Sequence, residues 1–136
     1  MKPSLTTAKV YLDALDLSYI TRKMCSSTYP LPRWPDALAK TCENLYKRFL
    51  WLMVKYHDEG LVPTRDIDEF WHNHILYTQE YTKDCHALLG RYIHHKPAEP
   101  TDSATIALLA NAFLKTQALY LEEFNEVLQV LQRTGE

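Results

Sequence analysis

The sequence is poor in the residues that mark β-sheets and disulfide frameworks. It has only three glycines in 136 residues, and the tight-turn dipeptides typical of β-hairpins are missing. The three cysteines are an odd number and show no CxxC spacing, which argues against a disulfide framework and favours free thiols in a reducing compartment. We therefore expect an all-α protein with a cytoplasmic location.

An excess of charge of one sign is also missing. The formal net charge is -2, and the lysines and arginines are spread along the chain, so neither nucleic acid nor an anionic membrane surface is an expected partner. No apolar run approaches the roughly 20 residues of a membrane span. The polar start, Met1 to Ser4, does not resemble a signal peptide. Residues 1–136 are expected to form a single helical domain with a real core.

Apolar periodicity predicts four helical segments, at about 5–24, 35–60, 64 or 66 to 90, and 102–132. The second is expected to be the most buried, because apolar residues extend beyond its seam. In the last, capped by Thr101 or Asp102, we expect a set of apolar residues to face inward: Ile106, Leu109, Phe113, Leu119, Tyr120, Phe124, Val127, Leu128 and Leu131. The connections are short, which predicts a single four- or five-helix bundle, mostly antiparallel.

A cluster of metal-ligating and proton-transferring side chains lies between positions 66 and 95. Five of the six histidines fall there, interleaved with aspartates and a cysteine. On a straight helix the side chains of His72 and His74 point about 200° apart, given 3.6 residues per turn. His72 lies one turn after Asp68, whereas His74 lies on the apolar face. These two histidines would therefore not chelate one ion by themselves.

Whether distant histidines can meet depends on the shape of the third segment. In an unbroken helix His72 lies about 27 Å from Gly90 at 1.5 Å per residue. The five residues from Gly90 to His95 extend at most about 17 Å, so a straight helix forbids a shared site. A break at Tyr77-Thr78 would bring the groups together, because Thr78 is a good N-cap residue and a modest helix former. Both geometries are open at this point.

Each of these residues has a structural and a functional interpretation. His74 and Cys85 fit a packed core, Asp84 an exposed helical position, and His94-His95 a solvated loop. The functional interpretation is a site for a divalent transition metal such as zinc or iron, with Cys85 a weaker candidate and with Trp71 and Tyr81 in support. Its candidate ligands are His72, His74, Asp68, Asp84, His94 and His95.

The same residues resemble a known family. The string Trp71-His72-Asn73-His74, followed by Tyr81, Asp84-Cys85, Gly90 and His94-His95, is similar to the conserved block of the glycine-rich domain-containing protein-like family. The resemblance covers roughly residues 13 to 97. The chain departs from the family in three respects: Tyr77 stands where short members often carry aspartate, no proline follows the WHxH segment, and the glycine-rich tail is absent. The resemblance implies a domain of unknown function and names no reaction.

Two functions from different classes follow. The first is an interaction or adaptor module that binds another protein, in which the histidines form a buried polar network; no nucleophile elbow, phosphate loop or HExxH motif indicates an enzyme. The alternative is a metal-binding protein or small metalloenzyme, since helical bundles build such sites from facing helices. A metal-free acid–base enzyme is a third hypothesis, without a sequence feature that names a substrate.

Overall fold

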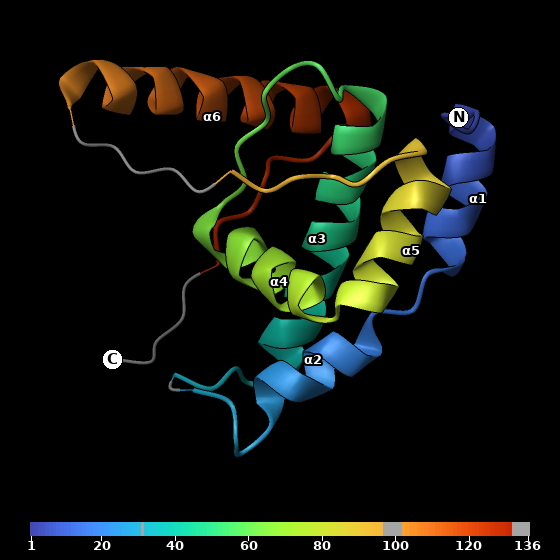
Figure 1. Ribbon diagram of the computed structural model, residues 1–136. Coiled ribbons are helices and arrows are strands. Elements are labelled where there is room, and N and C mark those ends of the chain that lie inside the picture. The colour runs from blue at the N-terminus through green and yellow to red at the C-terminus, as the bar shows by residue number, and fades with distance from the viewer. Residues whose placement is uncertain (31, 97–101, 132–136) are drawn as a thin grey trace.

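The computed structural model describes residues 1–30, 32–96 and 102–131, and in these ranges it contains six helices and no strands (Figure 1). The all-α prediction is confirmed. The count exceeds the expected four or five because two of the predicted segments are each broken in two. The helices are α1 (Leu5–Ala14), α2 (Ser18–Cys25), α3 (Asp36–Lys55), α4 (Arg65–Leu76), α5 (Thr78–Leu89) and α6 (Ser103–Phe124).

Helix α3 is the centre of the bundle, as predicted. It packs against α1, α2, α4 and α6, and it supplies eleven buried residues. It ends at Lys55 rather than near Gly60, because Tyr56 leaves helical geometry and a short turn follows. Gly60 stands in that turn with φ of 68°, a left-handed conformation that favours glycine.

The predicted helix over 5–24 is interrupted, so this boundary prediction is wrong. Leu15 to Leu17 separate α1 from α2, although the sequence there has neither proline nor glycine. Asp16 provides the reason: its Oδ1 accepts a hydrogen bond of 2.8 Å from the backbone amide of Ser18. Such local bonds from aspartate compete with helical bonding. The break lets α1 pack on α5 while α2 packs on α4.

Of the two geometries that the sequence left open, the structure has the break: α4 and α5 are separate helices, although Thr78 is the first residue of α5 and not its N-cap. Tyr77 is both the C-cap of α4 and the N-cap of α5, with φ of -87° and ψ of 74°. Its amide bonds to the carbonyl of His74, and its own carbonyl accepts from the amide of Tyr81. At the start of α4 the hydroxyl of Thr64 accepts from the amide of Ile67. Thr64 is therefore the N-cap.

Helix α6 is shorter and more exposed than predicted. It begins at the Asp102 cap, whose carboxylate accepts from the amide of Thr105, and it ends at Phe124 because Asn125 adopts a left-handed conformation. Ile106 and Val127 are 53% and 76% exposed, so the prediction that they face inward is wrong. The other predicted cap, Thr101, and the predicted end, Gln132, lie outside the described residues.

Among the helices of the described ranges, α6 alone is long and apolar enough in composition to cross a membrane, and 11% of its most apolar window is buried. No apolar segment of this length was expected from the sequence. Polar contacts tie the helix to the bundle, since the Thr116 hydroxyl accepts from the Val62 amide and Glu123 pairs with Lys55. Figure 1 shows α6 lying across one end of the other helices.

Candidate metal site and cleft

Three potential metal ligands meet on the outer side of α4. Asp68, His72 and His95 each offer one ligand atom, and these atoms all lie within 4.8 Å of one another. His95 Nε2 donates to Asp68 Oδ1 at 2.5 Å, and His72 Nε2 lies 3.7 Å from Asp68 Oδ2. The imidazole centroids of the two histidines are 4.6 Å apart. Two imidazoles thus share one carboxylate.

The break at Tyr77 makes this meeting possible. Asp68 and His72 are one turn apart on α4, while α5 packs against α4 and α1 and ends at Gly90. Gly90 has φ of 77°, and a Cβ there would lie 2.4 Å from the carbonyl oxygen of Met1. Residues 91–96, which we call the strap, then run back to α4 and deliver His95.

Hydrogen bonds and ring contacts hold the strap against α4. The Tyr81 hydroxyl accepts from Trp71 Nε1 at 2.9 Å and donates to the carbonyl of Ile93 at 2.5 Å. The His95 ring lies against the Trp71 ring, with centroids 4.1 Å apart. Trp71 and Tyr81, predicted as supporting residues, therefore connect both helices to the strap that carries His95.

The predicted ligands His74 and Asp84 form a separate, buried network. His74 is 1% exposed, and its Nε2 donates to Asp84 Oδ2 at 2.9 Å. Its Nδ1 bonds to the Tyr46 hydroxyl at 2.7 Å, and the Tyr11 hydroxyl donates to Asp84 Oδ1 at 2.6 Å. These bonds join α4, α5, α3 and α1. The structural interpretation of His74 holds, whereas Asp84 is buried rather than exposed.

The last two candidates, His94 and Cys85, belong to neither group of hydrogen-bonded side chains. The His94 ring packs edge-on against Tyr92, so its neighbour His95 alone reaches Asp68. Cys85 is 2% exposed in the core, and burial raises the pKa of its thiol. A thiol in such an environment is a packing residue rather than a thiolate ligand.

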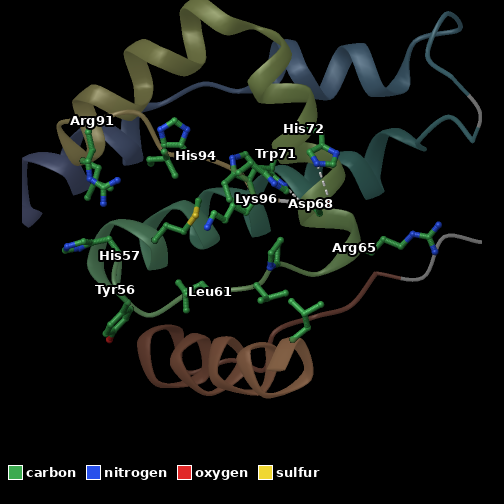
Figure 2. Close-up of a pocket in the computed structure, with 18 residues that line it drawn as sticks. Tyr56, His57, Leu61, Arg65, Asp68, Trp71, His72, Arg91, His94 and Lys96 are labelled. Atoms are coloured by element: carbon green, nitrogen blue, oxygen red, sulfur yellow. Dashed lines mark hydrogen bonds and ion pairs between the residues drawn. The ribbon is translucent and has the colours of Figure 1, made fainter. Parts of the chain in front are cut away.

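A cleft of about 740 Å³ opens beside the Asp68–His72–His95 group. Figure 2 shows it between the α4 side of the bundle and α6. Its residues come from the end of α3, the 56–63 connection, α4, the strap and α6: Met53, Tyr56, His57, Gly60, Leu61, Val62, Pro63, Arg65, Asp68, Trp71, His72, Leu89, Arg91, Ile93, His94, His95, Lys96 and Leu109.

Sequence reasoning missed two kinds of residue. Tyr11 and Tyr46, which complete the His74 network, are ordinary members of apolar helical stripes, and no sequence signal identifies their partners. The cations of the cleft, Arg65, Arg91 and Lys96, come from three separate places along the chain. Their gathering depends on the bend and the strap, so a search for clustered charge along the sequence cannot find it.

Burial raises the pKa of four tyrosines, Tyr11, Tyr19, Tyr46 and Tyr81, and Asp84 adds to the effect at Tyr11 by hydrogen bonding. Above about pH 10 the unfolded chain releases these protons while the folded chain keeps them. The unfolded state then binds fewer protons, so the free energy of unfolding falls as pH rises. We expect absorbance at 295 nm to show that these four ionise only as helical circular dichroism is lost. Ionisation of all nine tyrosines near pH 10 with full helicity would contradict this.

Comparisons with known proteins agree with the sequence resemblance. The UCP032817-like family matches residues 10–115. Two plant proteins from Arabidopsis thaliana are also similar: Glycine-rich domain-containing protein 1, 34% identical over 83 residues, and Glycine-rich domain-containing protein 2, 31% identical over 93 residues. These alignments cover 58% and 65% of this chain but only 10% and 12% of the relatives.

The chain thus spans about a tenth of the length of these curated relatives. No solved structure matches it. The family match includes α4, α5 and the strap, so it covers the whole Asp68–His72–His95 group and the buried His74 network. On this extent of similarity the chain belongs to the UCP032817-like family, a glycine-rich domain-containing protein-like family of unknown function.

Proposed function

We propose that this domain binds a divalent transition metal through Asp68, His72 and His95 and directs the open coordination positions into the cleft. The observation that carries the proposal is the convergence of three ligand atoms within 4.8 Å on the wall of a cleft. Two imidazoles and one carboxylate suit zinc, iron, copper or nickel. Three protein ligands with a free position are the arrangement of catalytic rather than structural sites.

The spacing of the donors fits a metal after small side-chain rotations. Ligand atoms at about 2.0–2.2 Å from zinc lie roughly 3.5 Å apart in tetrahedral geometry. The Asp68 oxygens lie 2.5 and 3.7 Å from His95 Nε2 and His72 Nε2. The His72 side chain is 56% exposed, so it can rotate and an ion can approach from solvent. His95 is held by the Trp71 ring, which limits the reorganisation that binding requires.

The interaction module predicted from the sequence is supported by a different feature, the exposed apolar side chains of α6. Leu114 and Leu121 are 63% and 48% exposed, and their spacing of seven residues places them on one side of the helix. This apolar surface does not indicate which partner it would bind, whereas the imidazole and carboxylate groups of Asp68, His72 and His95 indicate a metal ion. The metal-binding function is therefore the one that we propose, and the metal-retention experiment below distinguishes it from the interaction module.

We expect purified protein exposed to zinc, cobalt or iron(II) and then dialysed to retain one ion per chain, measured by elemental analysis and by titration calorimetry. His72→Ala and His95→Ala should each weaken binding on the order of 100-fold or more, because each removes one of three ligands. The matched control is His94→Ala, the adjacent histidine of the strap, which lines the cleft without joining the group.

Thermal melts of the metal-free variants provide the second control. His72 is exposed, so its removal should change the free energy of unfolding by no more than about 0.5 kcal/mol. A parent protein that retains none of these ions would refute the proposal and leave the interaction module as the better hypothesis. Equal losses of affinity in His94→Ala and His95→Ala would also refute it, since they would place the ion elsewhere.

A further inference from the structure

The charged side chains that line the cleft are mostly positive. Its lining includes Arg65, Arg91 and Lys96 but only one carboxylate, that of Asp68, which is engaged with two histidines. Within the described ranges none of these three cations forms an ion pair. A divalent ion at the Asp68–His72–His95 group would add two further positive charges. A small anion is the ligand that such a cleft favours.

The three cations lie in different parts of the cleft. Figure 2 shows Arg91 and Tyr56 at the end of the cleft away from His72, and Lys96 between them and His72. The side chain of Arg65 extends away from the group in the same view. Lys96 follows His95 directly in the strap, and both residues line the cleft.

The remaining wall of the cleft is apolar. Met53, Leu61, Ile93 and Leu109 come from α3, the 56–63 connection, the strap and α6, and they face the same space. A volume of about 740 Å³ is in the range of sites for small organic molecules and is far larger than an inorganic anion needs. Hydrophobic side chains with a small number of polar and charged groups favour a ligand with an apolar body and one anionic head.

We propose that the cleft binds a small organic carboxylate whose head ligates the metal at Asp68, His72 and His95 and pairs with Lys96, and whose apolar body packs between Leu61 and Leu109. This inference rests on the proposed metal site. The metal and the ammonium group hold the carboxylate oxygens by charge-assisted contacts. The apolar wall excludes the body of the ligand from water.

The test uses the chain of residues 1–136 loaded with cobalt(II), because the visible spectrum of cobalt reports a change in its ligands. The probes are 3-phenylpropanoate, propanoate, 3-phenylpropan-1-ol and inorganic phosphate. We expect 3-phenylpropanoate to shift the spectrum and to bind at least tenfold more tightly than each of the others. Propanoate and phosphate lack the apolar body, and the alcohol lacks the charge.

Variants test the orientation of the ligand. Lys96→Gln should weaken 3-phenylpropanoate about tenfold, because a hydrogen bond to a charged group is lost at the head of the ligand. Arg91→Gln, at the far end of the cleft, should change affinity less than threefold. Lys83→Gln, an exposed lysine of α5 outside the cleft, should leave it unchanged.

The possible failures are distinguishable. Protein that binds no cobalt overturns both the metal site and the carboxylate site. Protein that binds one cobalt per chain but shows no spectral response to 3-phenylpropanoate overturns the present inference alone. Equal affinity for phosphate or propanoate overturns the apolar subsite, and a loss in Arg91→Gln equal to that in Lys96→Gln overturns the assigned orientation.

Discussion

Replacing His74 by alanine is expected to lower the free energy of unfolding by about 3–5 kcal/mol, the range for breaking a buried pair by removal of one partner. Its Nε2 donates to Asp84 and its Nδ1 bonds to the Tyr46 hydroxyl, with the ring 1% exposed. Alanine would leave a carboxylate and a hydroxyl buried with fewer partners, and it would open a cavity. The measurement is urea unfolding followed by circular dichroism.

The expected loss is a large share of the roughly 5–15 kcal/mol that stabilises a typical domain. The matched control is His86→Ala, an exposed histidine of α5, which should cost no more than about 0.5 kcal/mol. Asp84→Ala should be as damaging as His74→Ala, and the double variant should cost clearly less than the two single losses together. Full additivity, or a His74→Ala loss below about 1 kcal/mol, would show that the pair does not act as a unit.

Replacing Tyr81 by phenylalanine is expected to cost about 2 kcal/mol of stability and roughly tenfold in metal affinity. The substitution removes the acceptor for Trp71 Nε1 and the donor to the Ile93 carbonyl, so two buried groups lose their partner. Ile93 lies two residues before His95 in the strap. Loosening it would leave His95, the third ligand of the proposed site, less well positioned, and residues that orient metal ligands typically contribute 10–100-fold to affinity.

Tyr19→Phe is the matched control for this substitution. The Tyr19 hydroxyl is buried and has no hydrogen-bond partner among the described residues. Its removal should therefore leave stability unchanged or raise it, and it should not alter metal affinity. Urea unfolding and cobalt titration of both variants give the comparison. Equal effects of Tyr81→Phe and Tyr19→Phe on metal affinity would exclude a positioning role for the Tyr81 hydroxyl.

The local features of the fold could be predicted from the sequence. Helical periodicity identified α3 as the buried centre, and Thr78, a modest helix former, indicated where a break between α4 and α5 could lie. The reach of the chain then required this break for any meeting of distant histidines. The end of α6 could not be predicted, because Asn125 adopts a left-handed conformation inside an apolar pattern that continues to Leu131.

The candidate ligands were predicted as a set. The sequence separated His72 from His74, but it did not predict which other residues join each of them. Helical geometry separates His72 from His74, and the structure gives each its own cluster. Nothing in the sequence distinguishes His94 from His95, because which of two adjacent strap residues faces α4 depends on how the strap packs. The roles of Tyr46 and Tyr11 depend on tertiary contacts between distant helices.

Helix α4 has a solvent-exposed side, which carries His72, and a buried side, which carries His74 only two residues later. The donors at positions 68 and 72 touch solvent, while position 74 bonds only toward the interior. Replacing the side chains at positions 68 and 72 by others that prefer a softer or harder ion should therefore leave folding intact. Substitutions at positions 68 and 72 should be tolerated because the contacts that stabilise the fold are made by His74, on the opposite side of the same helix.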